Sequence, residues 1–337
     1  MYIARWDLDK TYLRTDFDTP RELLRTAIER PDQKQTVPGA ATLMRELSDA
    51  GTEIHILSGS PEQLRGRVVE KLRLDGVRFA SLTLKPNLQN LLRLRFRSLR
   101  GQLGYKLPAL LRRRCEMPTQ RDRSGDLVQE TLFGDDAEAD AFVYSIYADI
   151  CAGQVDGDQL AEVMRVERCY EDDIADTVRI ASYIEPGPVV EHILIHLERQ
   201  SSPVDFNLYG SRVVPFYNYL QAACVLYEGG RLPPRSVLRV AQDLALKQRF
   251  DGGTLARSYL ELARRGHVAG AGIAALAEDY AELVRERRVA GASELREMVT
   301  ELELRAPEIP PPPSRPEPEL DYPALAVDSN PRLRKRR

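Results

Sequence analysis

Two aspartates separated by one residue follow an apolar stretch near the start of the chain. Asp7 and Asp9 belong to the run Asp-Leu-Asp-Lys-Thr, and residues 2–8 are expected to form a short buried strand. Residues two apart on an extended chain point the same way, so both carboxylates face one site. Carboxylates this close repel unless a cation or a shared proton lies between them, and Mg²⁺ prefers such oxygen ligands. Capping of a helix or strand is the alternative.

A second acidic group follows the apolar residues 131–133. Asp135, Asp136 and Asp140 lie there in the run Gly-Asp-Asp-Ala-Glu-Ala-Asp. Carboxylates gathered at a strand end are costly unless they bind a cation. A helix N-terminus also tolerates acidic residues through its dipole, so capping is again the alternative.

A hydroxyl and two lysines lie between the acidic groups. Ser58 follows the expected strand 53–57. The hydroxyl and backbone amides of such a turn suit a phosphate oxygen, although serine is also a common helix cap. Lys106 lies near an expected helix start, where it would place positive charge against a phosphoryl group. Lys85 competes with Lys106 for that role.

The first half of the chain alternates strand-like and helix-like segments. We expect strands at 2–8, 53–57, 77–84 and up to 133, and helices at 40–50, 61–73, 106–115 and 138–150. Alternation of this kind predicts an α/β fold with a Rossmann-like, doubly wound parallel sheet. Ligands bind beyond the carboxyl ends of the strands in such sheets, and the acidic and hydroxyl groups lie at those ends.

The rest of the chain is expected to be mostly helical. We predict a first domain over residues 1–155, a helical accessory region over 156–305, and a proline-rich and basic disordered tail over 306–337. The expected helices are 213–227, 234–250, 253–264, 271–287 and 293–304. Periodicity does not decide whether residues 189–197 form a strand or a short helix.

Several other features have a structural explanation. The arginine-rich residues 93–114 form either a solvated helix face with a loop or a basic rim that attracts an anionic substrate. His192 and His196 are four apart, but Ile193 stands where a zinc-protease motif needs glutamate, so surface or core positions are expected. The aromatic residues at helical spacing are expected to be core residues: Phe216, Tyr217, Tyr219 and Tyr227.

The composition is that of a soluble globular protein. The chain has 337 residues, 43% of them hydrophobic, and a formal net charge of −3, so nothing global indicates nucleic acid or an anionic membrane as a partner. Its four cysteines form no closely spaced pair, which suits a reducing compartment. We see no signal peptide and no apolar run long enough for a transmembrane segment, and we therefore expect a cytoplasmic protein.

The order of these groups resembles the four motifs of the haloacid-dehalogenase (HAD) superfamily. The segments PGAATLMRELSDAG, ILSGSPEQL, YKLPALL and LFGDDAEAD are similar, more narrowly, to the catalytic domain of bacterial and fungal phosphatidate phosphatases. This resemblance covers residues 2–149. Two positions depart from that group, since Lys10 stands where another acid is usual and Asp136 where a small residue is usual.

The resemblance implies a role for each residue. Asp7 would attack phosphorus, and Asp9 would protonate the leaving oxygen and then activate water. Ser58 would hold a phosphoryl oxygen, and Lys106 would neutralise charge on nucleophile and phosphate. Mg²⁺ would rest on Asp7, on the backbone carbonyl of Asp9 and on Asp135. Asp136 and Asp140 would lie around these ligands, with Asp140 orienting Lys106 or a metal-bound water.

The implied function is Mg²⁺-dependent hydrolysis of phosphomonoesters through an aspartyl-phosphate. Only about 25 residues separate Thr11 from the next expected helix, too few for a large folded cap. An open site suits a bulky phosphorylated substrate such as phosphatidate, a lipid. The alternatives are a phosphatase for nucleic-acid ends or phosphoproteins, and a catalytically silent HAD-like protein whose helical half binds a partner of unknown identity.

Overall fold

The computed structural model describes residues 1–13, 35–85, 102–117, 120–286, 290–314 and 316–329. Residues 93–101 of the arginine-rich stretch, expected to be either a solvated helix face with a loop or a basic rim, lie outside the described residues. Most of the short connection between Thr11 and the first helix lies outside them as well, at residues 14–34.

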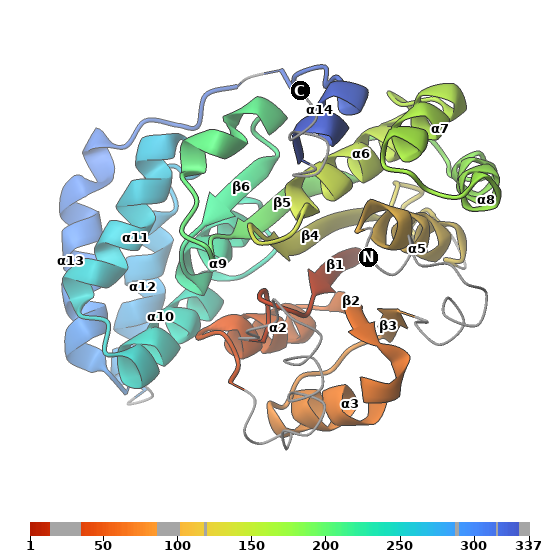
Figure 1. Ribbon diagram of the computed structural model, residues 1–337. Helices are drawn as coiled ribbons and strands as arrows, with labels where there is room; N and C mark the ends of the chain where they lie inside the picture. The colour runs from red at the N-terminus through yellow and green to blue at the C-terminus, as the bar shows by residue number, and fades with distance from the viewer. Residues whose placement is uncertain (14–34, 86–101, 118–119, 287–289, 315, 330–337) are drawn as a thin grey trace.

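Six parallel strands form one sheet in the order β3-β2-β1-β4-β5-β6 (Figure 1). Their bounds are β1 Tyr2–Asp7, β2 Thr52–Pro61, β3 Ser81–Lys85, β4 Gln129–Asp135, β5 Val190–His196 and β6 Val213–Phe216. The predicted α/β fold with a Rossmann-like parallel sheet is therefore confirmed. The strand order reverses between β1 and β4, and such a switch point opens a crevice at the carboxyl ends of the strands.

The sheet is buried on both faces. Neighbouring residues of one strand belong to different cores: Phe133 packs into one and Leu132 into the other, as do Leu194 and Ile193. Parallel sheets covered by helices on both sides have strands of this nearly continuous apolar kind. The alternation of side chains decides which core each residue enters.

Helices cover each face. The first core contains residues of α2 Ala40–Asp49, α3 Arg65–Leu74, α9 Tyr219–Glu228, α10 Pro234–Gln248, α11 Gly252–Arg265, α12 Ile273–Arg285 and α13 Ala292–Arg305. The second contains residues of α5 Leu103–Cys115, α6 Asp140–Ala152, α7 Gly157–Val166, α8 Glu171–Ala181 and α14 Tyr322–Ser329. Figure 1 shows these two groups on opposite sides of the sheet. The short 3₁₀ helices are Glu62–Leu64, Pro203–Tyr209 and Ala306–Glu308.

The segment expected to be a helical accessory region supplies the last two strands. Residues 190–196 form β5, which settles the open choice in favour of a strand. The helix expected over 213–227 is wrong at its start, because Val213–Phe216 is β6, four consecutive buried residues. The helix begins only at Tyr219, after Asn218 accepts a hydrogen bond from the Gln221 amide as its N-cap. The boundary expected near residue 155 falls between α6 and α7, and two strands lie beyond it.

The disorder predicted for the tail is wrong for Tyr322–Ser329, which is α14. Tyr322 and Ala326 are buried in the second core, and the Tyr322 hydroxyl hydrogen-bonds to the carboxylate of Asp149. Leu320 and Leu325 also pack against this core, so a short apolar segment docks the helix although the flanking sequence is proline-rich and charged. Among the described residues, every helix is too short or too polar to cross a membrane.

Candidate active site

The ends of two neighbouring strands bring the predicted acidic groups together. β1 and β4 pair in parallel with Trp6 opposite Phe133, so Asp7 and Asp135 emerge side by side at the carboxyl edge. Both are almost wholly buried, at 1% exposure each. The tight turn after β4 then leads into α6, whose first residue is Asp140. The pairing of β1 with β4 therefore brings together two carboxylates, those of Asp7 and Asp135, that are 128 residues apart in the sequence.

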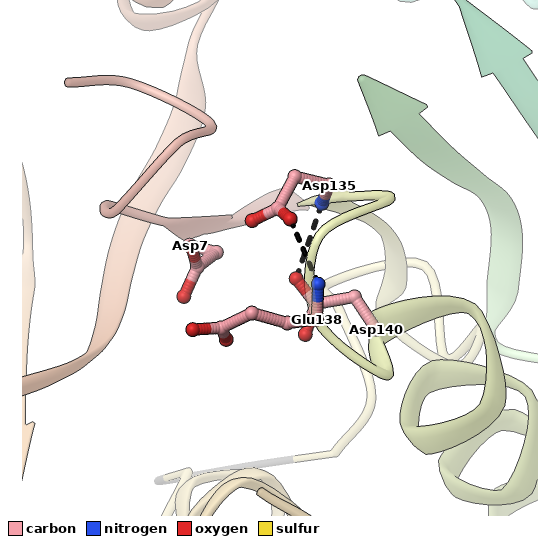
Figure 2. A group of neighbouring side chains, drawn as sticks. All are labelled: Asp7, Asp135, Glu138 and Asp140. Carbon is pink, nitrogen blue, oxygen red and sulfur yellow. Dashed lines mark hydrogen bonds between the residues drawn. The ribbon is translucent and has the colours of Figure 1, made fainter. Parts of the chain in front are cut away.

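Four carboxyl groups form an acidic cluster: Asp7, Asp135, Glu138 and Asp140. Each offers an oxygen that lies within 4.8 Å of the others. Figure 2 shows their side chains gathered around one space between the end of β1 and the turn before α6. The turn is braced from within, because Asp135 Oδ1 accepts hydrogen bonds from the amides of Ala137 (2.6 Å) and Glu138 (3.0 Å).

Lys106 supplies positive charge to this cluster. It lies on the first turn of α5, is fully buried, and places Nζ 3.0 Å from Asp7 Oδ1. The same ammonium lies 2.7 Å from Glu138 Oε2 and 2.5 Å from Asp140 Oδ1. Burial by itself would lower the pKa of Lys106, but the carboxylates of Asp140, Asp7 and Glu138 raise it well above its usual value. Lys106 is therefore a fixed cation beside Asp7.

The carboxyl groups carry more negative charge than one lysine can balance. Burial raises the pKa of Asp7 and of Asp135 well above the usual range, and the neighbouring carboxylates of the cluster raise both further. Burial also raises the pKa of Asp140 to about 6, although Lys106 opposes the shift. These raised pKa values mean that the fully ionised form of the cluster is unfavourable unless a further cation binds to it.

Asp9 lies apart from the acidic cluster and is oriented by serines of β2. Its Oδ2 accepts hydrogen bonds from Ser58 Oγ (2.9 Å) and Ser60 Oγ (2.8 Å). The two serines are two residues apart on an extended strand, so both hydroxyls point toward Asp9. Ser58 Oγ in turn accepts the Ser60 amide at 2.9 Å. β2 continues to Pro61, past the end expected at residue 57. Ser58 therefore lies within the strand and contacts Asp9, and it is not part of a turn.

Two predicted residues lie outside this arrangement. Asp136 directs its carboxylate away from the cluster, to the amides of Arg199 (2.7 Å) and Ser201 (3.0 Å) in the segment after β5. Lys85, at the end of β3, places Nζ 5.4 Å from the centre of the Tyr105 ring. Burial lowers the pKa of Lys85 to about 8. The lysine in contact with Asp7 is thus Lys106.

Sequence reasoning missed Glu138, Ser60 and Thr11. The Thr11 hydroxyl lies 3.4 Å from Asp7 Oδ2 and 3.5 Å from Asp135 Oδ2, so it contacts both carboxylates. Thr11 belongs to the same motif as Asp7 and Asp9. Ser60 lies two residues beyond Ser58, so the alternation of side chains along a strand could have predicted that both serines face the site. Glu138 carried no such signal, because a glutamate in the turn before a helix is usually a favourable dipole partner.

The residues present fit a divalent cation. The cluster offers several carboxylate oxygens in one buried place, which is the ligand type that Mg²⁺ takes. Asp7 Oδ1 is buried and accepts no hydrogen bond from the described residues, because the nearby Lys106 ammonium is not aligned with it. Asp7 shares the Lys106 ammonium with Glu138 and Asp140, so a further cation would lower the cost of burying its carboxylate.

A cleft of about 750 Å³ opens elsewhere, at the opposite edge of the sheet. It is lined by the amino ends of three strands, at Tyr2, Thr52 and Gln129, and by Arg121 and Arg231. This cleft is therefore separate from Asp7 and Asp135, which lie at the carboxyl ends of the strands. Parallel sheets bind their ligands at that end.

Comparisons of the sequence with known protein families and with curated proteins identified no relative. No model of a known protein family matches the chain, and no curated protein is significantly similar to it.

Proposed function

We propose that the chain is a Mg²⁺-dependent hydrolase of phosphomonoesters that works through an aspartyl-phosphate on Asp7. The observation that carries this proposal is the environment of Asp7: a buried carboxylate with Lys106 Nζ 3.0 Å away and the oxygens of three other carboxyl groups within 4.8 Å. A carboxylate held among a fixed cation and metal-binding oxygens suits attack on a phosphorus atom whose negative oxygens must be neutralised.

Asp7 is the nucleophile in this proposal. Its carboxylate oxygen forms a bond to phosphorus while the ester P–O bond breaks, and the leaving oxygen takes a proton. Lys106 stabilises the negative charge on Asp7 and on the phosphoryl oxygens that approach it. Asp140 and Glu138 hold the Lys106 ammonium in place.

Asp9 is the general acid and then the general base. It is only partly buried and lies beside Ser58 and Ser60 at the same edge of the sheet as Asp7. In its protonated form it gives its proton to the leaving oxygen. It then takes a proton from a water molecule that attacks the phosphorus, and this step releases phosphate and restores the Asp7 carboxylate.

Asp7, Asp135 and the Asp9 carbonyl would hold Mg²⁺, with Glu138 next to them. The ion would supply positive charge for the phosphoryl oxygens. The supporting observation is the excess of buried carboxylates over the single ammonium of Lys106.

The substrate is a phosphomonoester, and a bulky one such as phosphatidate is the first to test. The alternatives, nucleic-acid ends and phosphoproteins, belong in the same panel. The wild-type protein should release phosphate from at least one member in the presence of Mg²⁺, and rapid acid quenching should trap phosphate on the protein. Asp7→Asn keeps the shape but removes the nucleophilic charge, so both signals should vanish. A variant that still turned over substrate would contradict the assignment of Asp7.

A further inference from the structure

The loop that follows the nucleophile has a costly backbone conformation. Lys10 has φ +61°, in the left-handed region that residues with a side chain adopt reluctantly. Within the loop, residues 8–13, the amides of Tyr12 and Leu13 both donate to the Leu8 carbonyl, at 3.0 and 2.8 Å. This nucleophile loop carries Asp9 and begins directly after Asp7, so its backbone conformation bears on the position of both carboxylates.

Tyr219 reaches this loop from the first turn of α9. Its hydroxyl donates a hydrogen bond of 2.6 Å to the Thr11 carbonyl, across 208 residues of sequence. The ring is fully buried and stacks on Trp6 with 5.7 Å between ring centres, while Phe216 packs against its edge at 5.1 Å. Burial raises the pKa of Tyr219 well above its usual value, so the hydroxyl keeps its proton and remains a donor.

His196 reaches the same loop from the end of β5. Its Nδ1 lies 3.2 Å from the carbonyl oxygen of Lys10, the residue with the left-handed backbone, and a protonated Nδ1 donates to it. His196 is beside Asp135 in the register of β4 and β5, and its ring contacts Tyr219 with 5.7 Å between ring centres. Two consecutive carbonyls of the loop, those of Lys10 and Thr11, are therefore each held by a side chain from beyond residue 190.

We propose that Tyr219 and His196 are positioning residues that hold the nucleophile loop in its left-handed conformation, and so hold Asp7 and Asp9 toward the substrate. The effect on turnover rests on the proposed function, whereas the effect on the loop backbone does not. On this view the strands and helix after residue 190 complete the active site without touching substrate.

Tyr219→Phe tests the first contact, because it removes the hydroxyl and keeps the ring. The chain offers a matched control in Tyr259→Phe. Tyr259 is equally buried and its hydroxyl donates a bond of the same 2.6 Å length to the Ala269 carbonyl, between α11 and the turn that follows it. Both substitutions remove one buried hydroxyl from one backbone carbonyl, so their general effects on stability should be similar.

The readouts are amide hydrogen exchange in the peptide that covers residues 8–13 and steady-state kinetics on a nitrophenyl phosphate. We expect Tyr219→Phe to speed exchange at Tyr12 and Leu13 and to lower kcat about tenfold with little change in KM, a loss of about 1.4 kcal/mol. Tyr259→Phe should leave both at wild-type values. Equal exchange and equal kcat in the two variants would overturn the proposal.

His196 provides a second, independent pair of variants. Asn places an amide donor near the position of Nδ1, so His196→Asn should retain slower loop exchange and a higher kcat than His196→Ala. If wild-type protein hydrolyses no phosphomonoester, the proposed function fails and the exchange data alone decide the inference. Faster loop exchange in Tyr219→Phe than in Tyr259→Phe then supports it, and equal exchange contradicts it.

Discussion

Ser58 Oγ donates a hydrogen bond of 2.9 Å to Asp9 Oδ2, which ties the second strand of the sheet to the loop after the first. Ser60 donates to the same oxygen at 2.8 Å. Asp9 thus has a fixed orientation although it is only partly buried.

Asp9→Asn should separate acid catalysis from nucleophilic attack. General acid–base help is worth about 10²–10⁴-fold, so hydrolysis of an alkyl phosphate should fall by that factor. Nitrophenolate leaves without a proton, so the nitrophenyl ester should lose much less. The ratio of the two kcat/KM values, compared with that of the parent, measures the effect. An equal loss on both esters would show that Asp9 does not protonate the leaving group.

Removal of divalent ions should abolish hydrolysis, and Mg²⁺ but not Ca²⁺ should restore it. Ca²⁺ takes more ligands at longer distances than the about 2.1 Å of Mg²⁺, which would let the Asp7 carboxylate bind in a pose that cannot attack. Initial rates on nitrophenyl phosphate after chelation and re-addition test this. Full activity in excess chelator is incompatible with the proposed metal dependence.

Asp135→Asn should stabilise the metal-free protein. Burial, with Asp140 and Glu138, raises the pKa of Asp135, so the folded state loses stability as pH rises through the carboxylate range. The neutral amide removes this cost, and the Tm without metal should rise by about 2–4 °C. Mg²⁺ should raise the Tm of the wild type by binding the folded state, and of this variant far less.

Asp136→Asn is the matched control for that measurement. The Asp136 carboxylate accepts one backbone amide on each oxygen, from Arg199 and Ser201, so an asparagine loses one acceptor. This variant should have a lower Tm than the wild type and keep the Mg²⁺-dependent rise. A rise in Tm for Asp136→Asn, or a fall for Asp135→Asn, would contradict the charge balance described for the acidic cluster.

Lys106→Met should reduce kcat far more than Lys85→Met. Both side chains are buried, at 0% and 6% exposure, but it is Lys106 that contacts Asp7. Loss of a group that stabilises charge in the transition state typically costs about 10²–10³-fold in kcat. We expect a loss of that size for Lys106→Met and a loss below tenfold for Lys85→Met. The opposite order would assign the phosphate-binding role to Lys85.

Protonation of His267 should oppose folding as the pH is lowered from 6.5 toward 4. Burial, together with nearby Arg265 and His192, lowers the pKa of His267 to about 4. Between those values the unfolded state binds the proton more readily, so stability is full above pH 6.5 and is lost as pH falls. The contribution is at most about 3 kcal/mol. His267→Gln should reduce the dependence on pH of the free energy of unfolding by urea between pH 4 and 6.5. An unchanged dependence would show that His267 does not contribute.

Local patterns in the sequence predict which polar residues gather at one edge of the sheet. The apolar runs before Asp7 and Asp135, and the alternation of strand-like and helix-like segments, predict parallel strands whose carboxyl ends share an edge. These are local patterns, since a strand or helix reveals itself through the period of its own side chains. The same reasoning failed at Val213–Phe216, because a four-residue apolar strand directly before a helix has too few residues for its period to show.

Which of these side chains contact one another depends on the tertiary structure. Glu138 joins the acidic cluster through the shape of one turn, Asp136 turns away from it, and Lys106 rather than Lys85 contacts Asp7. Tyr219 and His196 reach the nucleophile loop across 208 and 186 residues of sequence, although Tyr219 was expected to be an ordinary core aromatic and His196 a surface or core residue. Contacts between distant segments depend on the packing of whole layers, and no local period along the chain encodes them.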